Sequence, residues 1–482
     1  MPRMRTSSSA ELLLDLHRDG PLPLHSQLEQ GLRGSIRSGR LAAGSIMPST
    51  RSLAGQLGLS RGVVVEAYEQ LVAEGYLTSQ PGGATRVCTN ATERGPERGS
   101  ITQAPSYRID FGYGRPDVSQ FPRAAWLRSL RRVLNATPND RLSYLDRRGS
   151  VELREALANY LNRVRGTAAA PDRMMVCNGF AQALDLVAQE LAVTGRTSIA
   201  VEEPGQRDTI EAARRHGLQT VAIPVDGDGV VVDALVRTDA DAIVVTPAHH
   251  FPTGAVLSPE RRAALVAWAA DGRRLVLEDD YDAEYRYDRE PIGAIQGLAP
   301  EHVVYAGSAS KTLAPGLRLG WIVAPSDLVD RLATRKEAID RGSPSLEQLA
   351  FADFLERGEF DHHLRRMRPI YRGRRDALLR ALHRHLPDLT PVGASAGLHV
   401  VAWLPPDLDE AAVVARSGAI GVRVDGVGRH HALASLARQG LLFGYGTPSE
   451  DEIDEGIRAV ASVIAALRAE AASSREALRS HS

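Results

Sequence analysis

Cysteine and lysine are both scarce in this chain of 482 residues, and no long hydrophobic run occurs in it. The two cysteines, Cys88 and Cys177, are too few for a disulfide framework or a cysteine-based zinc site, and we expect no bound metal. No apolar run approaches the ~18 residues of a membrane-spanning helix, and residues 1–20 contain acidic residues and no apolar signal core. The sequence therefore predicts a globular protein of the cytoplasm.

Only two of the 58 basic residues are lysine, Lys311 and Lys336. A guanidinium keeps its proton near neutral pH, whereas a lysine amine can be tuned to act as a nucleophile. Each lysine is therefore a candidate for covalent chemistry. For Lys336, the flanking Arg335 and Glu337 predict a solvated helix face instead.

Composition divides the chain into segments. Residues 1–88 contain closely spaced helical patterns, and residues 89–108 are polar, contain Pro and Gly and lack periodicity, which is typical of a linker. From residue 109 to about 465, short apolar runs alternate with longer amphipathic patterns, and residues 466–482 form a tail. We therefore expect one domain at 1–88 and a larger one at 109–465.

Two helical patterns lie near the start of the chain. Apolar residues recur at helical spacing from Leu22 to Arg40, which predicts a first amphipathic helix. Ser49 or Thr50 is a suitable N-cap for a short second helix that ends at Leu57.

A tight turn and a third helix follow. Gly58 breaks the second helix and Ser60 caps a longer helix from Arg61 to about Glu74, so that the pair forms a helix-turn-helix. Two short strands, 76–79 and 84–88, are joined by the turn Gln-Pro-Gly-Gly and predict a β-hairpin that forms a wing.

The positive charge of this domain is local. Between Gly31 and Val65 there are five arginines and no acidic residue, which is typical of a DNA-facing surface, because arginine neutralises phosphates and contacts guanine edges. Hydroxyl groups and amides at helix N-termini can add phosphate contacts. Helix-turn-helix folds also occur as protein-interaction modules, so that alternative stays open here. The candidate DNA contacts are Arg33, Arg51, Ser49, Thr50, Ser60 and Arg61.

Residues 22–87 resemble the winged helix of GntR-type regulators in nearly every helix, turn and wing element. Two departures, His25 in place of a tyrosine and Ala84 in place of the second wing glycine, lie outside the recognition helix. The resemblance implies that a double-stranded DNA operator is a partner of this chain.

The C-terminal domain contains short apolar runs separated by longer helical patterns. This alternation predicts a mostly parallel sheet with helices on both faces. The runs are Met174–Cys177, Ser198–Val201, Ala242–Thr246, Leu275–Leu277, Val303–Ala306 and Leu319–Val323.

Three motifs of this domain, EDDYDAEY, GSASK and PGLRLGW, contain reactive side chains. One apolar run delivers Asp279 and Tyr281 to the carboxyl end of a strand, and the next delivers Lys311. Ligands of open α/β sheets bind outside those ends. An aldehyde cofactor with a phosphate would use a carboxylate, a phenol, hydroxyls, an amine and Arg318 together. The alternative is that Asp and Tyr at these strand ends are structural.

Residues 109–465 resemble the fold type I aminotransferases, which depend on pyridoxal 5′-phosphate (PLP). GSASKTLAPGLRLGW is similar to their lysine–phosphate segment, and the resemblance implies a Schiff base between PLP and Lys311. It also implies that Asp279 pairs with the pyridine nitrogen and Tyr281 with the phenolic oxygen. In YLDRRGSVELREAL, Tyr144 would reach the phosphate of the neighbouring subunit, which implies a homodimer. The other implied phosphate ligands are Gly179, Phe180, Ala181, Ser308, Ser310 and Arg318.

Both domains together resemble the MocR-type regulators over almost the whole chain. The resemblance implies a multidomain fold with an N-terminal winged helix-turn-helix (α+β) and a C-terminal α/β PLP-dependent transferase fold type I with a smaller α+β subdomain. It implies a transcriptional regulator that responds to PLP or to an amine or amino-acid effector. The alternatives are a working aminotransferase with an N-terminal DNA-binding module, and a DNA-binding protein whose PLP site is vestigial.

Three departures from the aminotransferase pattern bear on the effector and on turnover. Gln206 replaces the aromatic residue that stacks on the ring, Phe251 replaces the asparagine of Asn-Pro-Thr-Gly, and Leu442 replaces the arginine that clamps a carboxylate. We therefore expect an aminotransferase-like fold used for sensing, with negligible turnover. His250 or His249 can substitute for the asparagine, although neighbouring histidines in a loop are more often surface residues. The candidate effector contacts are Arg429, Arg423, His250 and Gln206.

Overall fold

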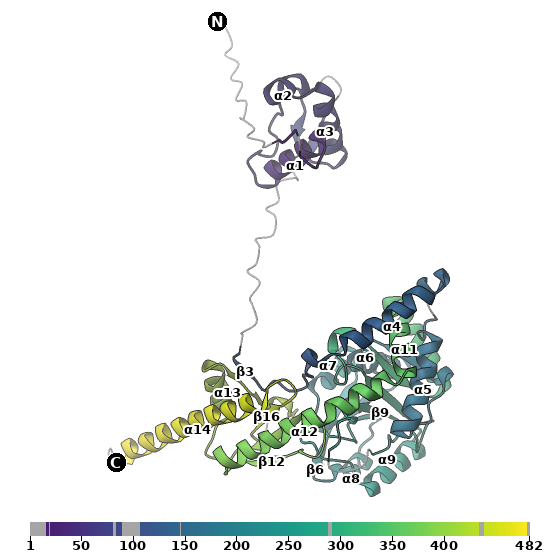
Figure 1. The fold of residues 1–482 in the computed structure, drawn as a ribbon, viewed down its shortest axis with the longest axis vertical. Coiled ribbons are helices and arrows are strands. Elements are labelled where there is room, and N and C mark those ends of the chain that lie inside the picture. The colour runs from purple at the N-terminus through teal and green to yellow at the C-terminus, as the bar shows by residue number, and fades with distance from the viewer. Residues whose placement is uncertain are drawn as a thin grey trace. The chain divides into compact units, whose positions relative to one another are not determined.

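The computed structural model describes residues 16–18, 20–80, 83–88, 107–144, 146–287, 292–432 and 438–479. The chain divides into two compact units, Met1–Pro105 and Ser106–Ser482 (Figure 1). The expected linker falls almost entirely on residues 89–106, and the tip of the expected wing on residues 81–82; both lie outside the described residues.

The first unit is a winged helix-turn-helix, as predicted. It contains α1 (Leu24–Arg37), α2 (Thr50–Leu57) and α3 (Arg61–Ala73), followed by the antiparallel pair β1 (Leu77–Thr78) and β2 (Arg86–Val87). The three predicted helices are confirmed with ends that differ by at most a few residues. Their apolar faces, which include Leu28, Leu32, Leu53, Val64 and Leu71, form one buried core.

Local sequence explains where the second and third helices begin and end. The hydroxyl groups of Ser49 and Ser60 each accept a hydrogen bond from a backbone amide three residues further on, which satisfies a donor that the helix leaves unpaired. Of the two predicted N-caps of α2, the structure uses Ser49 and not Thr50. Gly58 ends α2 with a φ of +64°, a left-handed conformation that favours glycine.

The second unit is built on an eight-stranded sheet with the order β4-β11-β10-β9-β8-β5-β6-β7. Strand β11 is antiparallel to both neighbours and β7 to β6, and the other pairs are parallel, so the predicted mostly parallel sheet is confirmed. All six predicted strands are present, whereas β6 and β7 were not predicted. The strands are β4 (Met174–Cys177), β5 (Ser198–Glu203), β6 (Gln219–Asp226), β7 (Gly229–Val230), β8 (Ala242–Val245), β9 (Leu275–Asp280), β10 (Val303–Ser308) and β11 (Gly320–Val323).

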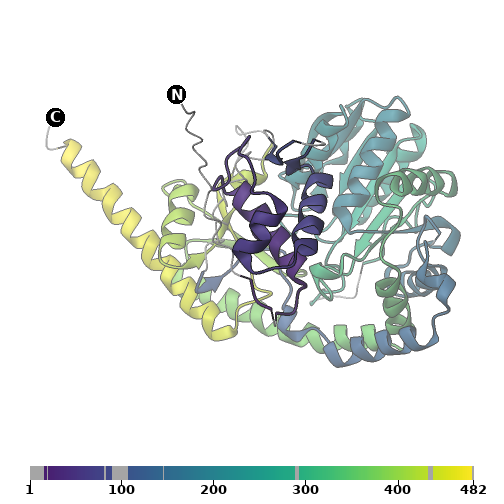
Figure 2. The same ribbon diagram turned by 90° about the horizontal axis from the view of Figure 1, so that it is seen from above.

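Helices cover both faces of this sheet (Figures 1 and 2). In β9, Leu277 packs with α6, α7 and α10, whereas its neighbour Val276 packs with α8 and α9 on the other face. Apolar residues at consecutive positions are expected where both faces of a strand are buried. The helices before the smaller part are α4 (Arg123–Ala136), α5 (Val151–Arg165), α6 (Phe180–Val193), α7 (Arg207–Arg215), α8 (Val232–Val236), α9 (Pro259–Asp271), α10 (Ser326–Asp340) and α11 (Ser345–Glu356).

A smaller α+β part completes the second unit, as predicted. Its antiparallel sheet has the order β12-β13-β16-β15, and β3 (Ile109–Asp110), where the described chain of this unit begins, pairs with β14 (Val422–Arg423). In Figure 1, α12 and α14 lie side by side. The remaining elements are α12 (Glu359–His385), β12 (Thr390–Val392), β13 (His399–Trp403), α13 (Glu410–Ala419), β15 (Asp425–Gly426), β16 (Gly440–Gly444) and α14 (Glu450–Arg479).

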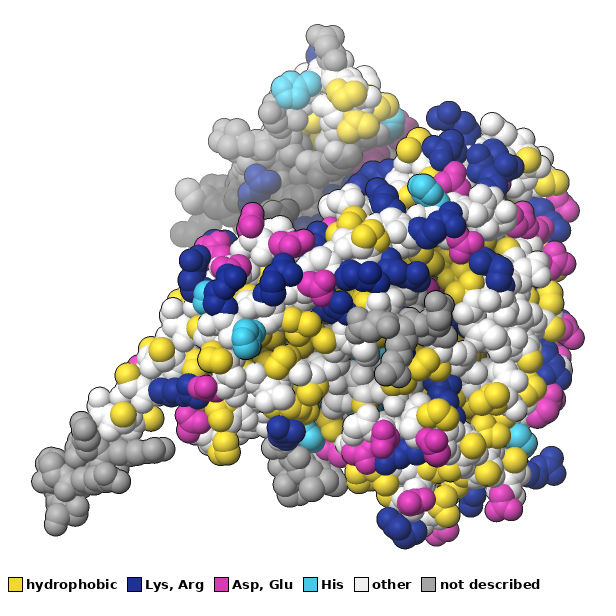
Figure 3. All heavy atoms as spheres, turned by 60° about the horizontal axis from the view of Figure 1, so that its bottom comes forward, with side chains coloured by type: hydrophobic (Ala, Val, Ile, Leu, Met, Phe, Trp, Pro, Cys, Tyr) yellow, Lys and Arg dark blue, Asp and Glu magenta, His cyan; other side chains and the backbone are white. Residues whose placement is uncertain are grey.

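Helix α14 continues to Arg479, through most of the segment that we expected as a tail. None of the helices within the described part of the chain is long and apolar enough to cross a membrane. Basic and acidic side chains are interspersed over the face of the second unit shown in Figure 3.

The expectation that Lys336 lies on a solvated helix face is wrong. Its side chain is 1% exposed, and its amine lies 3.0 Å from the carboxylate of Asp340, one turn further along α10. The amide of Gln182, from α6, donates a hydrogen bond to the same carboxylate. The lysine is therefore part of the contact between α10 and α6, which its charged neighbours in sequence do not reveal.

A buried ion pair ties the end of α5 to the end of β9. Arg165 Nε donates a hydrogen bond of 2.7 Å to Asp280, and the Tyr305 hydroxyl donates another to the same carboxylate oxygen. Burial by itself would lower the pKa of Arg165, but the charges of Asp280, Tyr305 and Glu284 and the hydrogen bond to Asp280 together raise that pKa. Removal of the guanidinium would leave Asp280 buried without its counter-charge.

We therefore expect Arg165→Leu to lower the free energy of unfolding by about 3–5 kcal/mol, measured by urea denaturation. The matched control is Arg163→Leu on the same helix. Arg163 pairs with Asp361 and its side chain is 58% exposed, so this change should cost about 0–1 kcal/mol. Equal losses in the two variants would contradict a special role for the buried pair.

Candidate functional site

A cavity of about 300 Å³ lies at the carboxyl ends of β9 and β10 and at the N-terminus of α6. This is the edge at which open α/β sheets bind ligands. The predicted site residues that line it are Gly179, Phe180, Ala181, Gln206, Asp279, Tyr281, Ser308, Ser310, Lys311 and Arg318.

Lys311 enters the cavity directly after β10. Its amine donates a hydrogen bond of 2.5 Å to the carbonyl oxygen of Gly114. Burial lowers the pKa of Lys311, although the carboxylates of Asp282 and Asp279 oppose that shift. A lowered pKa increases the fraction of neutral amine, which is the nucleophilic form.

Asp279 presents a buried carboxylate to the same cavity. Burial raises its pKa to about 8, and the charge of Asp280 adds to that effect, whereas a hydrogen bond from the Gln206 amide opposes it. The Gln206 nitrogen lies 2.6 Å from the carboxylate oxygen. A cationic nitrogen placed against this carboxylate would favour its ionised form, so the site suits a protonated ring nitrogen.

The opposite end of the cavity is suited to an anion. Gly179 is the N-cap of α6 and has a φ of +91°, a conformation that favours glycine and leaves the first amides of the helix open. The guanidinium of Arg318 lies next to Gly179 and donates to the carbonyl of Asn178. With the hydroxyls of Ser308 and Ser310 nearby in the lining, this end offers a guanidinium, helix amides and hydroxyls to a phosphate.

The remaining wall is aromatic and apolar. The ring of Phe251 lies 4.8 Å from that of His430 and 5.0 Å from that of Tyr113, between ring centres. Leu442 is fully buried and packs in the same cluster as Phe251. Two of the three departures from the aminotransferase pattern thus contribute to one apolar cluster. The guanidinium of Arg429 covers the Tyr113 ring at 5.2 Å.

The expectation that neighbouring histidines lie at the surface is wrong for His249 and His250, which are both buried. His250 faces the Thr253 hydroxyl at 2.7 Å, and burial lowers its pKa to about 3. His249 Nδ1 lies 3.1 Å from the hydroxyl of Tyr281. Neither histidine lines the cavity.

Other predicted site residues lie outside the cavity lining. Arg423 lies within 4 Å of the carboxylates of Asp110 and Asp425, and Arg429 is paired with Asp425. Tyr144 is 85% exposed.

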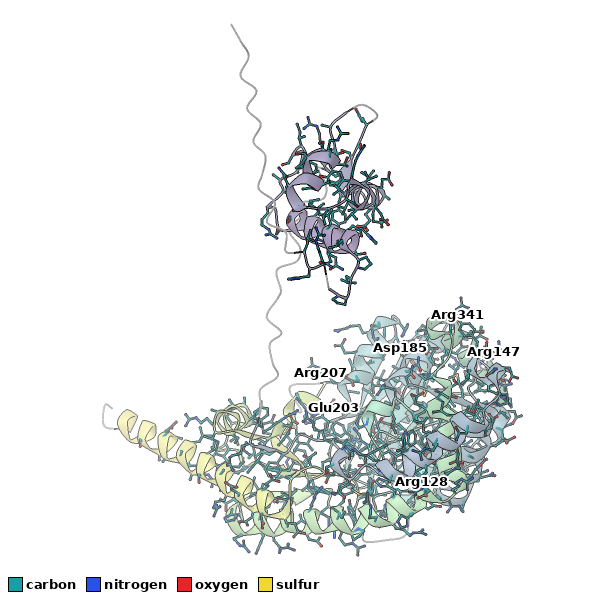
Figure 4. The ribbon with its side chains drawn as sticks, turned by 45° about the horizontal axis from the view of Figure 1, so that its top comes forward. Arg128, Arg147, Asp185, Glu203, Arg207 and Arg341 are labelled. Atoms are coloured by element: carbon teal, nitrogen blue, oxygen red, sulfur yellow. The ribbon has the colours of Figure 1, made fainter. Side chains whose placement is uncertain are left out.

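Several lining residues were not predicted. Gly114 has a φ of +68°, and a Cβ there would lie 2.9 Å from the amine of Lys311, so the glycine of FGYG could have been recognised as a point of close approach. His399 and His430 come from the smaller part, far along the sequence, and no local pattern marks them. Arg207, at the start of α7, is labelled in Figure 4. Glu203, at the end of β5, is also labelled there but does not line the cavity. The unpredicted lining residues are Tyr113, Gly114, Arg207, Asp208, His399 and His430.

In the first unit, the predicted DNA contacts separate into two groups. Arg51 and Arg61 are exposed in the first turns of α2 and α3, next to the capping hydroxyls of Ser49 and Ser60. Arg33 instead donates hydrogen bonds of 2.7 Å to Glu74, which ties α1 to the end of α3.

Comparisons with known proteins match both units. Residues 108–432 match the family of class I and II aminotransferases, and residues 24–87 match the gntR family of bacterial regulatory proteins. Among solved structures, the multiple substrate aminotransferase of Thermococcus profundus is 26% identical with a TM-score of 0.70, over 76% of this chain and 93% of that one. An archaeal alanine:glyoxylate aminotransferase is 28% identical with a TM-score of 0.67, over 74% and 90% of the two chains.

Curated relatives extend over both units. The probable rhizopine catabolism regulatory protein MocR of Rhizobium meliloti is 34% identical over 95% of this chain and 97% of its own length. The HTH-type pyridoxine biosynthesis transcriptional regulator PdxR of Corynebacterium glutamicum is 31% identical over 92% and 96%. The chain therefore belongs to the MocR-type transcriptional regulators, in which a GntR-family winged helix-turn-helix is joined to a domain of the class I and II aminotransferase family.

Proposed function

We propose that the domain at residues 1–88 binds operator DNA in the cytoplasm and that the domain at 109–465 binds PLP through Lys311. PLP itself, or an amine or amino acid, then controls transcription. The observation that carries this proposal is the cavity, in which the half-buried amine of Lys311 and the buried carboxylate of Asp279 share one space with an anion-binding end formed by Arg318 and α6.

The residues of the cavity fit PLP in kind and in placement. Asp279 would hold the pyridine nitrogen and Tyr281 the phenolic oxygen, while the anion-binding end would hold the phosphate. When bound, PLP supplies an aldehyde that condenses with the amine of Lys311 and releases one water molecule. The lowered pKa of Lys311 favours this condensation because it increases the fraction of unprotonated amine.

We propose that the regulator is a homodimer in which Tyr144 completes the partner's phosphate site. Tyr144 is 85% exposed and lies outside the cavity lining of its own chain. Leu127 and Leu134 of α4 and Leu142 are each 53% exposed in the preceding segment. Exposed apolar side chains that gather along one segment are typical of a protein interface.

Among the predicted effector contacts, Gln206 is the one that lines the cavity. Arg429 follows as a second candidate, because it covers the ring of Tyr113 at the apolar wall. Arg423 and His250 are engaged with other side chains outside the lining. Whatever the effector, it shifts the regulator only if it binds two arrangements of the protein with different affinities.

The PLP site is tested by reduction with borohydride. We expect the protein to bind PLP with a yellow colour that borohydride bleaches, and peptide mapping to find the cofactor on Lys311. Lys336, the chain's other lysine, is the internal control, because it is buried and paired with Asp340. Lys311→Ala should abolish the covalent label and keep the fold; label on Lys336, or none at all, would refute the assignment.

Operator binding is tested with arginine variants. We expect Arg51→Ala and Arg61→Ala each to weaken binding to specific and unrelated DNA alike, and to reduce the slope of log affinity against log salt by about one. Arg384→Ala in α12 is the control, because its side chain is 63% exposed in the second unit. Unchanged affinity and salt dependence in both test variants would contradict docking through α2 and α3.

The alternative function is a working aminotransferase. Phe251 and Leu442 stand where those enzymes carry polar groups that hold cofactor and substrate, and misplacement by about 1 Å can cost ~10²-fold in rate. We therefore expect the PLP-loaded protein to make no more than about one keto acid per bound cofactor with common amino acids. Sustained turnover at ~1 s⁻¹ or more would instead favour the enzyme.

A further inference from the structure

Three side chains form a chain of close polar contacts that leads away from the cavity. Tyr281 lines the cavity, and its hydroxyl lies 3.1 Å from Nδ1 of His249. The same Nδ1 lies 3.0 Å from the carboxylate of Asp282. The side chains of His249 and Asp282 are only 1% and 2% exposed, and neither residue belongs to the cavity lining.

The neighbours of His249 indicate where its protons lie. Nδ1 faces a carboxylate, and Nε2 faces the carbonyl oxygen of Gly393 at 3.4 Å, so each ring nitrogen has an acceptor in front of it. Burial would lower the pKa of His249, but the charge of Asp282 and its hydrogen bond outweigh burial and raise that pKa. Because each ring nitrogen faces an acceptor, we infer an imidazolium against the Asp282 carboxylate, a pair with no net charge.

The remaining groups around His249 do not disturb this arrangement. The ring of His399 lies 5.0 Å away; burial and the nearby charge of His249 keep the pKa of His399 well below its ordinary value, and its Nε2 faces the carbonyl oxygen of Pro252 at 3.0 Å. The charge of Arg286 also acts on His249. It lowers the pKa of His249, but its effect is the smallest of those that act on this residue, and the net pKa remains raised. Gly397 packs directly against the pair, since a Cβ there would lie 2.2 Å from His249 and 2.4 Å from Asp282.

The protonated His249 also determines the direction in which the Tyr281 hydroxyl proton points. A protonated Nδ1 cannot accept a hydrogen bond, so the Tyr281 hydroxyl cannot donate toward His249 and keeps its proton for the cavity. Burial, with the charges of Asp282, Asp279 and Glu202, holds the pKa of Tyr281 well above its ordinary value, so the hydroxyl stays protonated. A hydroxyl held in this way is a donor with one available direction.

We propose that His249 and Asp282 are positioning residues that hold the hydroxyl proton of Tyr281 toward the cavity, where it donates to an oxyanion of the ligand. The inference rests on the proposed function in taking that oxyanion to be the phenolic oxygen of PLP. A donor at this oxygen stabilises the deprotonated, more negative form of the bound chromophore and so lowers its pKa. The pH dependence of the visible absorbance measures that pKa without any turnover.

Asp282→Asn is the decisive variant, because it exchanges a neutral ion pair for a neutral histidine and a neutral amide of the same shape. Neutral His249 can then accept the Tyr281 proton and turn the hydroxyl away from the cavity. We expect the chromophore pKa to rise by about one unit, which is about tenfold in proton affinity. In a Tyr281→Phe background the same exchange should produce no further rise, because its effect passes through the hydroxyl.

The matched control is Asp185→Asn. Asp185 of α6, labelled in Figure 4, pairs at 3.1 Å with His216, the residue that follows α7, and lies outside the cavity lining. It should leave the chromophore pKa unchanged. The second variant is the double exchange Asp282→Asn/His249→Leu. Leucine offers the Tyr281 hydroxyl no acceptor, so the rise caused by Asp282→Asn should be lost, and circular dichroism establishes that each variant is folded.

The outcomes separate the two proposals. A wild-type protein that takes up no PLP refutes the proposed function. A wild-type protein that binds PLP, with a chromophore pKa that is unchanged by Asp282→Asn, refutes the positioning role alone. A rise that persists undiminished in the Tyr281→Phe background would also refute it, because the effect would then be purely electrostatic.

Discussion

Four buried carboxylates at the end of β9 constrain the rest of the second unit. Glu278, Asp279, Asp280 and Asp282 are each less than a tenth exposed. Neighbouring negative charges in a dry interior repel one another, and each is tolerated only if it is protonated, hydrogen-bonded or paired. Each carboxylate has a partner from a different element of the structure. These partners determine which of the four acids remains available to a ligand.

The alternation of a strand separates these carboxylates into two sets. Glu278 accepts hydrogen bonds from the backbone amides of Ile295 and Gln296, and Asp280 on the same face pairs with Arg165. Asp279 points to the other face, where its partner is a neutral amide. Its carboxylate is paired with no cationic side chain in the described part of the structure, and of these three acids it is the one that lines the cavity. The face of the strand on which an acid lies, rather than its residue type, determines whether it serves the structure or lines the ligand cavity.

The sequence predicted the elements and motifs of the site, because these are local. A strand followed by Asp279 and Tyr281, and another followed by Lys311, are short patterns, and a parallel sheet brings their ends together. It could not predict the aromatic wall, since Tyr113 and His430 meet Phe251 only through the tertiary fold. The expectation that Lys336, His249 and His250 are exposed was wrong for the same reason. Their burial depends on partners such as Asp282, whose position local charge does not indicate.

The cavity also joins the two parts of the second unit. Its reactive end belongs to the large sheet, whereas His399 and His430 come from the smaller part. Strand β3, which begins just after residues 89–106, pairs with β14 of that smaller part. A ligand that contacts both walls and prefers one arrangement of them will therefore also favour one position of β3. The chain that leads to the DNA-binding unit thus starts on the part of the structure that closes the ligand site.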